Sequence, residues 1–423
     1  MSNKQPGITA DKRFFSQSPF TRMRRRLRRS RRAVWSLRIL YVLVFVGVFG
    51  DFIANDKPLY CKIDGGHYFP VLRQYAVDLG LSTWEARFVQ NTWRDQPYEA
   101  VVFPPIPYTA TTLDLKNSNY RSPFAEQKVA SLRWRHWFGT DRLGHDVLAG
   151  LIAGTRVALL VGLIAMSIAA AIGILAGAFA GYFGDHGFRL SRTRLILNIA
   201  GLFAGWFYGF PARSYAFTTG GNSALLTGLL IFAGALLLAN VAAHLLEKIP
   251  AFGKRISVPV DLLVMRTIEV LNSVPGLLLL LSFVAVLHKS SVFYVMVIIG
   301  LIRWTGIARF LRAELLKIKN MGYVEAARAM GFSDWRILWR HALPNALGPV
   351  LITIAFGVAS AILLESVLSF LGLGVGEEGM TWGKLLAEAR RYPAAWWLAL
   401  FPGGAIFVAV TIFNLIGEGL TEK

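Results

Sequence analysis

YVEAARAMGFSDWRILWRHALPN, residues 323–345, is the most polar stretch in the second half of a strongly apolar chain. Apolar segments flank it, at about 292–307 on one side and 346–371 on the other. A membrane-spanning helix needs roughly 20 mainly apolar residues, and both flanking segments meet or approach that length. The stretch therefore predicts a loop between two membrane spans.

The composition agrees with a membrane protein. Of the 423 residues, 54% are hydrophobic and 17% are charged, and the mean hydropathy is +0.47. This balance is too apolar for a soluble globular protein of this size. The expected fold class is an all-α polytopic membrane protein. Its eight predicted spans lie at about 34–54, 155–182, 195–210, 223–246, 262–287, 292–307, 346–371 and 395–416.

The distribution of charge indicates the orientation. The formal net charge is +20, and much of the excess lies in TRMRRRLRRSRR, residues 21–32, directly before the first span. This position predicts a cytoplasmic N-terminus and argues against a nucleic-acid partner, whereas binding to anionic lipids remains open. The segment that follows, DFIANDKPLY (51–60), contains no small-residue cleavage site. The first span is therefore expected to be a retained helix in the lipid bilayer and not a signal peptide.

Counting the spans from a cytoplasmic start gives the domain organisation. The charged residues from Arg303 to Arg340 then lie in the cytoplasm, in agreement with the positive-inside rule. Lys384, Arg390 and Arg391 weaken the pattern, because they fall in the last outside loop. The predicted parts are a basic cytoplasmic tail (1–33), the first transmembrane helix (34–54), a periplasmic loop or subdomain (55–150) and a transmembrane domain (151–423).

The polar stretch itself predicts two helices that meet at a glycine. Good helix formers fill residues 313–330. Gly331 supplies the left-handed conformation that often ends a helix. Ser333 can cap the next helix, which is expected to end before Pro344.

Two faces of these predicted helices suit contact with another surface. Ala326 and Ala327 have no bulky side chain, and Trp335, Leu338 and Trp339 gather on one side at helical spacing. Such an apolar patch fits a groove on a partner protein. It fits a lipid surface equally well.

Residues 325–345 resemble the EAA loop of the permease subunits of ABC importers. The pattern is EAA, a glycine four residues beyond the second alanine, and a downstream Leu-Pro. His341 stands where the pattern favours isoleucine. In that family the loop is the coupling helix, which lies in a cleft of the ATP-binding subunit. The residues expected to contact that subunit are Glu325, Ala326, Ala327, Gly331, Trp335, Arg336, Leu343 and Pro344.

The resemblance extends beyond this loop. Residues 138–156, 260–280 and 361–375 are similar to segments of the dipeptide, oligopeptide and nickel permeases of the C type. Residues 53–70 resemble, more narrowly, the permeases of microcin C-type peptide importers. The resemblance implies a six-span permease core with a coupling loop at about 313–345. Residues 186–257 are then an insertion of two helices, which preserves the sidedness of everything after it.

The resemblance also implies partners and a location. The partners are a second homologous permease that completes a heterodimer, two ATP-binding subunits and a periplasmic solute-binding protein, in a bacterial inner membrane. The chain itself has no G-x-x-x-x-G-K-[ST] sequence. It is therefore expected to be a non-catalytic subunit without a cofactor of its own, and ATP and magnesium are expected on the partner subunits. The transported solute is expected to be a peptide or peptide-like molecule.

Charged residues inside membrane spans are costly and often functional. Glu365 fits a gate, although a polar contact that fixes helix packing stays open. Glu269 fits the pathway, although it can instead pair with Arg266 one turn away. The candidate pathway or gate residues are Glu269, Pro275, Glu365, Ser369 and Gly372.

Other functions and a metal site fit the sequence less well than an importer permease. A secondary transporter would be expected to show repeats and ion-coupling acids at the midplane, and a lipid-interacting membrane protein would need no ATPase partner. Asp141, His145 and Asp146 are close in sequence, but neither they nor the scattered histidines have the spacing typical of a metal site. The single cysteine, Cys61, excludes an intramolecular disulfide.

Overall fold

The computed structural model describes residues 27–85, 92–219, 221–249, 252–286, 291–374 and 379–421, together with residues 21 and 88. Most of the predicted basic tail lies outside the described residues. The chain divides into two compact units: unit 1 contains residues 1–175 and 269–423, and unit 2 contains residues 176–268. The described ranges contain seven helices long and apolar enough to cross a membrane, or eight spans if one bent helix pair counts as a span. The expected all-α polytopic fold class is confirmed.

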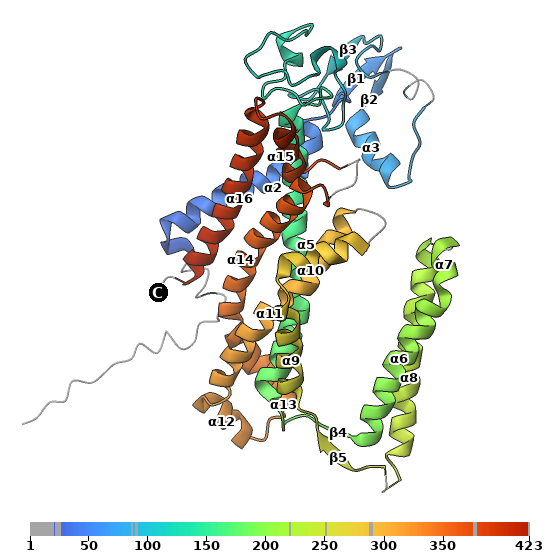
Figure 1. Ribbon diagram of the computed structural model, residues 1–423, viewed down its shortest axis with the longest axis vertical. Helices are drawn as coiled ribbons and strands as arrows, with labels where there is room; N and C mark the ends of the chain where they lie inside the picture. Colours follow the sequence, from blue (N-terminus) through green and yellow to red (C-terminus); the bar gives the residue numbers. More distant parts are fainter. Residues whose placement is uncertain are drawn as a thin grey trace, which may run out of the picture. The chain divides into compact units, whose positions relative to one another are not determined.

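The long helices of unit 1 pack against one another along their apolar sides (Figure 1). Their shared core includes Val161, Ala165, Leu280, Ile299 and Leu368. Helices are the expected solution in lipid, because each satisfies its backbone hydrogen bonds internally. The helices are α2 (Arg31–Ile53), α5 (Val147–Phe183), α9 (Val260–Ser273), α10 (Gly276–Val286), α11 (Val292–Ile318), α14 (Leu343–Phe370) and α16 (Trp397–Thr421); α5 and α9 continue across the boundary between the units.

Two glycines allow α5 and α11 to approach closely. A Cβ atom on Gly173 of α5 would lie 2.7 Å from Cβ of Ile307, and one on Gly300 of α11 would lie 2.8 Å from the carbonyl oxygen of Ala165. Neither position therefore accepts a side chain without movement of a helix. Such close approach of two helix backbones is the role that small residues typically have between helices in membranes.

The predicted span at 262–287 is bent and not straight. Helices α9 and α10 meet at an angle of 81°. Pro275 lies in the break, where it has no N–H to continue the hydrogen-bond ladder of α9. Its carbonyl oxygen instead accepts the N–H of Leu279 at 3.1 Å and begins α10.

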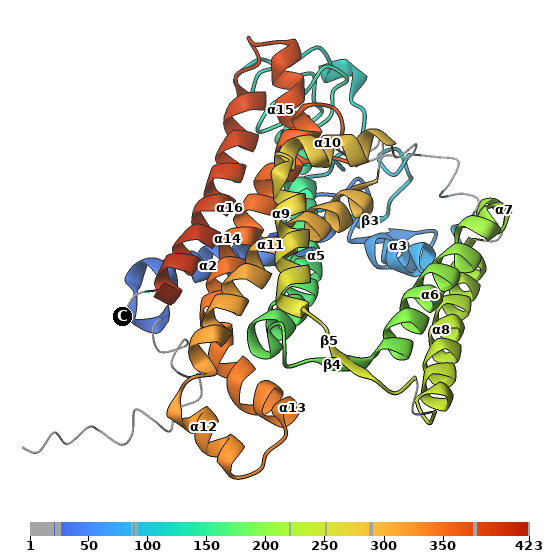
Figure 2. The same ribbon diagram turned by 60° about the horizontal axis from the view of Figure 1, so that its bottom comes forward.

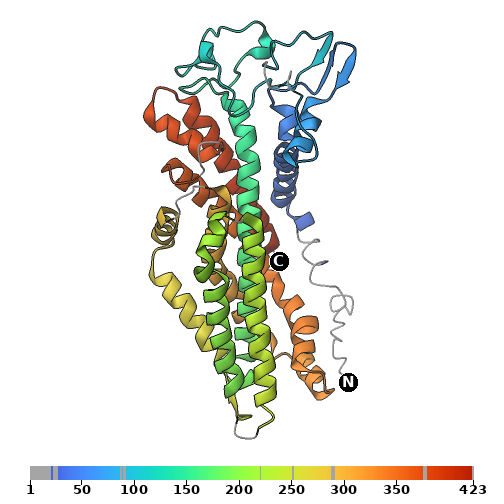
Figure 3. The same cartoon turned by 90° about the vertical axis from the view of Figure 1, so that its right-hand side faces the viewer.

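A small subdomain precedes α5. We use the name β-subdomain for residues 55–146. Its antiparallel sheet has the order β2-β1-β3, and Cys61, Ile63, Phe88 and Trp93 form a buried cluster around it. The β-subdomain lies at one end of the unit 1 helices, and α12 (Gly322–Ala329) and α13 (Asp334–Ile337) lie at the other end (Figures 1 and 3). Its elements are β1 (Tyr60–Ile63), β2 (Gly66–Tyr68), α3 (Pro70–Asp78), β3 (Ala100–Val102), η1 (Leu115–Asn117) and η2 (Leu132–Trp134).

Unit 2 contains the expected insertion and is a helical hairpin closed by a two-stranded sheet. Helices α6 and α8 run side by side (Figure 2). A Cβ atom on Gly201 of α6 would lie 2.7 Å from Cβ of Ala239, and the side-chain amides of Asn198 and Asn240 are hydrogen-bonded at 3.0 Å. Both inserted apolar windows are therefore helices. The elements are β4 (Arg189–Ser191), α6 (Arg192–Gly209), η3 (Pro211–Arg213), α7 (Ser214–Thr219), α8 (Gly221–Leu246) and β5 (Arg255–Ser257).

Candidate functional site

The polar stretch of the sequence folds into a helix-turn-helix, which we call the elbow (residues 319–343). Helix α12 ends at Gly331, whose φ of +81° is the left-handed value that glycine adopts without strain. The N–H of Phe332 donates to the carbonyl oxygen of Ala327 at 3.1 Å, and that of Gly331 donates to Arg328 at 2.9 Å. This is the Schellman arrangement that terminates helices. The Ser333 hydroxyl then accepts the N–H of Arg336 and caps α13, as expected.

The elbow has an inner apolar face that holds it together. Val324 and Ala327 of α12 are buried, and so are Ile337 and Leu338 of the following helix. Burial of apolar area stabilises this contact by about 25 cal/mol per Å². Each of the two predicted faces is thus split between the inner and the outer side of the elbow. Ala327 of the predicted alanine face and Leu338 of the predicted face with Trp335 and Trp339 pack inward, so neither is available to another surface as the sequence suggested.

The outer face of the elbow exposes large apolar groups. Tyr323, Met330 and Trp335 are 42%, 66% and 55% exposed, respectively, and Glu325 and Ala326 are exposed beside them. These side chains project from a loop that connects two membrane-spanning helices. Large apolar side chains gathered on such a surface indicate a contact with another molecule.

Polar contacts fix the orientation of the outer face. The Arg336 guanidinium lies over the Phe332 ring, 4.5 Å from its centroid, and Arg328 Nε lies 3.7 Å from Asp334 Oδ1 across the turn. The Trp335 and Trp339 rings are 5.5 Å apart. The turn between α12 and α13 is thus held by side chains as well as by backbone hydrogen bonds.

Two boundaries of the elbow differ from the prediction. The expected helix 313–330 is interrupted, because α11 ends at Ile318 and α12 begins at Gly322. The expected end before Pro344 is wrong: a helix runs without interruption from Asp334 to Phe370. A π-helical turn, η4 (Leu338–Ala342), explains why Pro344 is tolerated, since a widened turn relieves the clash that a proline ring makes with the preceding turn. Leu343 is buried at the start of α14, so it stabilises the elbow from inside.

The candidate gate residues lie near the β-subdomain end of unit 1. Glu365 of α14 is 1% exposed, and its carboxylate accepts a hydrogen bond from the Ser369 hydroxyl at 2.6 Å. Gly372, with φ of +81°, ends α14. Glu365 and Ser369 are thus brought together, whereas Glu269 lies on α9 and Pro275 in the bend after it.

A cavity of about 650 Å³ opens beside these residues. It lies between α15 (Trp382–Arg391), the end of α14 and the segment 141–145. Ser369 and Gly372 line it, together with Asp141, Arg142, His145, Lys384, Glu388 and Arg391. The cavity therefore combines charges of both signs at the end of the helices where the β-subdomain lies.

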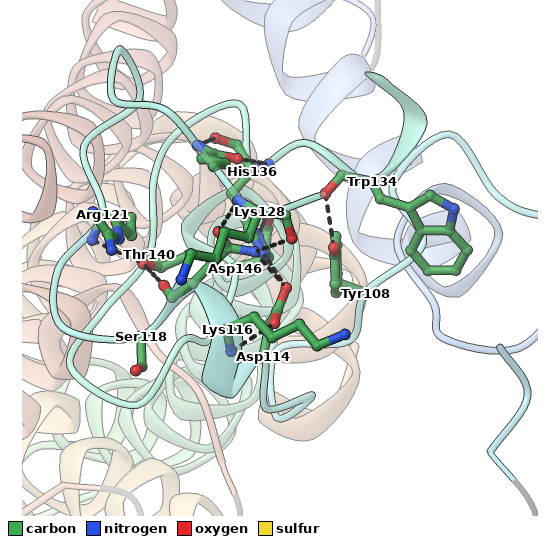
Figure 4. A network of polar contacts seen from close by, with 12 residues as sticks. Tyr108, Asp114, Lys116, Ser118, Arg121, Lys128, Trp134, His136, Thr140 and Asp146 are labelled. Carbon is green, nitrogen blue, oxygen red and sulfur yellow. Dashed lines mark hydrogen bonds and ion pairs between the residues drawn. The ribbon is translucent and has the colours of Figure 1, made fainter. Parts of the chain in front are cut away.

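A buried polar network, which the sequence did not reveal, joins the β-subdomain to the start of α5 (Figure 4). His136 is fully buried. Its Nδ1 lies 2.8 Å from Asp146 Oδ2, and its Nε2 lies 3.2 Å from Asp114 Oδ2. Asp146 Oδ1 also accepts the N–H of Ala149 in the first turn of α5. The network thus fixes three segments that are distant in sequence.

The protonation of this network follows from its contacts. Burial by itself would lower the pKa of His136, but the hydrogen bonds and negative charges of Asp146 and Asp114 outweigh that effect and raise the pKa. For Asp114, burial favours a higher pKa, but hydrogen bonds from Asn117 and His136 lower it. His136 is therefore stabilised as an imidazolium between two carboxylates. Asp146 pairs with His136, whereas His145 pairs with Asp141 at 2.6 Å. Among the described residues, no group of three or more His, Cys, Asp or Glu side chains is arranged so that it could hold a metal ion.

A second feature that sequence reasoning assigned differently is Arg303. We expected it among the cytoplasmic charges, but it is the twelfth of the 27 residues of α11. It lines two cavities, of about 330 and 460 Å³, between helices of unit 1. The reason for the difference is that α11 continues to Ile318, well beyond the expected end of the span.

The fold and these sites define a class: a polytopic membrane protein with a polar elbow at one end of its helices and a folded subdomain at the other. Residues 249–422 match the family described as binding-protein-dependent transport system inner membrane component. Residues 18–65 match the N-terminal transmembrane domain of oligopeptide transport permease C. In these two segments the chain is similar to permease subunits of ABC importers.

Individual relatives agree with this assignment. The chain is 29% identical over 402 residues to the inner membrane ABC transporter permease protein YejE of Escherichia coli K12, and the alignment covers 94% of each chain. It is 26% identical to the peptidoglycan transport system permease protein YejE of Agrobacterium fabrum, over 96% of this chain and 92% of that one. A putative peptide transport system permease protein of Brucella suis is 43% identical over 165 residues, 38% of this chain and 55% of the relative. The two relatives named YejE are consistent with the narrower resemblance to microcin C-type importers.

These similarities support part of the sequence expectations. The chain is a multi-pass membrane protein, and the permeases that it resembles work in general with an ATPase and a solute-binding protein. Such permease subunits are typically non-catalytic.

Proposed function

We propose that this chain forms half of the translocation pathway of a peptide importer and that the elbow couples it to separate ATP-binding subunits. A second, homologous permease completes the pathway as a heterodimer, two ATP-binding subunits bind ATP and magnesium, and a solute-binding protein delivers the cargo. The names of the relatives, which refer to peptide and peptidoglycan transport, support a peptide-like solute.

The observation that carries this proposal is the two-sided construction of the elbow. Its inner face is packed, with Val324 and Ile337 fully buried, so the elbow moves with the helix that follows it. Its outer face exposes Tyr323, Met330 and Trp335. An element that is firmly connected to a span and apolar on its outer side suits a contact with a protein that applies force.

The proposed orientation places the N-terminus and the elbow in the cytoplasm and the β-subdomain in the periplasm. Two observations support it. The β-subdomain and the elbow lie at opposite ends of the unit 1 helices (Figure 1), and the basic residues 24–32 directly precede or begin α2. The bacterial inner membrane is the corresponding location, in agreement with the E. coli relative.

Affinity purification tests the coupling role. The variant Ala326→Arg places a long charged side chain on the outer face, where Ala326 is exposed and its replacement leaves the inner packing intact. We expect this variant to stay in the membrane with its partner permease and to lose the ATP-binding subunits by at least tenfold. Deletion of residues 326–331 should have the same effect.

The matched control is Ala130→Arg, the same substitution at an exposed position of the β-subdomain. It should leave the complex unchanged. If Ala326→Arg and the deletion both retain normal amounts of the ATP-binding subunits, the elbow is not the coupling element.

A further inference from the structure

Arg303 is a cation in the middle of a membrane-spanning helix with little to neutralise it. Its guanidinium is half-buried and donates a hydrogen bond to the Ser360 hydroxyl of α14. A guanidinium offers five N–H donors, so one hydroxyl uses only a small part of its capacity. Among the residues that the structure describes, no aspartate or glutamate forms an ion pair with Arg303.

The space around Arg303 is open and contains no acidic side chain. The cavities of about 330 and 460 Å³ share Arg303, Asn272 and Thr305. The larger one is also lined by a second arginine, Arg309. No Asp or Glu is among the described residues that line either cavity. Volumes of this size are in the range of ligand-binding pockets, about 300–1,000 Å³.

Asn272 and Thr305 add neutral hydrogen-bonding groups to the same wall. Thr305 Oγ1 lies 3.5 Å from Asn272 Oδ1, which links α11 to α9. The amide group of Asn272 can donate through its nitrogen at the same time. The hydroxyl hydrogen of Thr305 is directed at Asn272 Oδ1 or at the carbonyl oxygen of Ile302, 3.3 Å away. The cavity wall therefore offers a fixed positive charge with one neutral donor, the Asn272 amide nitrogen, beside it.

Physical chemistry indicates what such a wall binds. An arginine near the bilayer centre is costly, and arginines that persist there pair with an acid or line a water-filled cavity. The planar guanidinium matches a carboxylate with two parallel hydrogen bonds. A cationic solute would be repelled by this wall, and a neutral one would gain hydrogen bonds without the charge attraction.

We propose that Arg303, with Asn272 and Thr305, forms an anion-binding subsite within the membrane, and that it receives a carboxylate of the transported solute. Arg309 adds to the positive potential of the same cavity. This inference rests on the proposed function, because the solute is taken to be a peptide-like molecule with a free carboxylate. An acid on the second permease is the competing partner for Arg303, and the experiments below separate the two.

The first experiment tests the anion site without any transported solute. Thr353 of α14, which lines the cavity of about 460 Å³ beside Arg303, is replaced by cysteine in the complete transporter. We then compare the rates at which this cysteine reacts with two methanethiosulfonate reagents. One reagent carries an anionic sulfonatoethyl group, and the other carries a cationic trimethylammonium group. Cys61 is fully buried, and the chain without Thr353→Cys measures any background. We expect the anionic reagent to be favoured and Arg303→Gln to lower the anion-to-cation rate ratio about tenfold, the factor that corresponds to 1.4 kcal/mol.

The matched control for charge removal is Lys317→Gln. Lys317 lies on the same helix, but its side chain is 68% exposed. The control should leave the rate ratio unchanged. An equal ratio in the Arg303→Gln variant and its parent overturns the anion site.

The second experiment assigns the ligand. Uptake of one peptide with a free C-terminal carboxylate is compared with uptake of its C-terminal amide, in vesicles that contain the whole transporter. We expect Arg303→Gln to lower uptake of the free carboxylate at least tenfold more than uptake of the amide, and Arg303→Lys to recover part of the loss. Equal losses for the two peptides overturn the assignment to a solute carboxylate.

Two further outcomes keep the proposals apart. If Arg303→Gln fails to co-purify with the second permease, then the acid partner lies on that subunit and the subsite proposal is wrong. If the wild-type transporter imports neither peptide, the proposed function fails, and so does the assignment to a peptide carboxylate. The labelling ratio at Thr353→Cys then still decides whether the anion site exists.

Discussion

Replacement of His136 by alanine is expected to loosen the β-subdomain where it joins α5. The histidine lies between two buried carboxylates, Asp146 at 2.8 Å and Asp114 at 3.2 Å, which are 2% and 8% exposed. Its removal leaves both without their shared cation. Breaking a buried pair in this way costs about 3–5 kcal/mol of stability. The equilibrium constant for local unfolding of the β-subdomain therefore increases roughly 10²- to several 10³-fold.

The pH dependence follows from the direction of the His136 pKa shift. Because the folded-state pKa is raised above the unfolded value of about 6.5, the stability from His136 is fully present below pH 6.5 and is lost as the pH rises through the folded pKa. For Asp114, whose folded-state pKa is lowered, the contribution is present above about pH 4 and is lost at lower pH. The network should therefore protect the β-subdomain best between about pH 4 and 6.5.

Hydrogen–deuterium exchange of residues 108–146 in the purified transporter measures this effect, after correction for the intrinsic pH dependence of exchange. The wild-type protein should lose protection as the pH is raised above 6.5, and the His136→Ala variant should be less protected than the wild type at pH 6. Trp137→Ala is the control, because the neighbouring side chain is 53% exposed. Adding Asp114→Asn to His136→Ala should restore part of the protection, since it removes one of the two facing charges. Protection in His136→Ala equal to that of the wild type at pH 6 would refute the reasoning.

The left-handed backbone of Gly331 and the close contact of Gly154 give further predictions. Gly331→Ala forces an L-residue into a left-handed conformation, at a cost of about 1–2 kcal/mol, so the amide hydrogens of α12 should exchange faster. Gly322→Ala is the control, because open space surrounds Gly322, and it should leave the exchange unchanged. Equal exchange rates in the two variants would contradict the role of Gly331. Gly154→Val should lower the thermal unfolding temperature by several degrees, because a Cβ atom there would lie 2.5 Å from Cδ1 of Trp382. Gly234→Val, which meets no atom within 4 Å, should not, and an unchanged unfolding temperature in Gly154→Val would show that the contact is not tight.

Local signals in the sequence predicted the turn of the elbow well. Gly331 and Ser333 act at the positions expected of them, because helix ends depend on residues within a few positions of the turn. The inward orientation of Ala327 and Leu338 was not predicted, since it depends on the contact between α12 and the next helix. The helix end predicted from Pro344 was wrong for a related reason. The rule that a proline ends a helix assumes a regular α-helix, and the turn before Pro344 is π-helical.

Contacts between distant segments account for the features that were missed. Asp114 and His136 are separated by 22 residues, and no spacing rule joins them. Arg303 has a sequence environment like that of the other arginines near the elbow, and only the full length of α11 places it inside the bundle. Glu365 and Ser369 are one turn apart on the same helix, so their contact follows from helical geometry alone, whereas their role in a gate stays a prediction.

The uninterrupted helix from Asp334 to Phe370 gives the proposed coupling a physical route. Its 37 residues correspond to a length of about 55 Å, with Trp335 of the outer elbow face at one end and Ser369 of the large cavity at the other. The features that favour bending, the π-helical turn and the prolines at 344 and 349, all lie near the elbow. From Val350 to Phe370 the sequence has no proline. A force applied to the elbow can therefore change the angle at which the helix enters the bundle, while the remaining part carries that displacement to Ser369 and Gly372 with little loss.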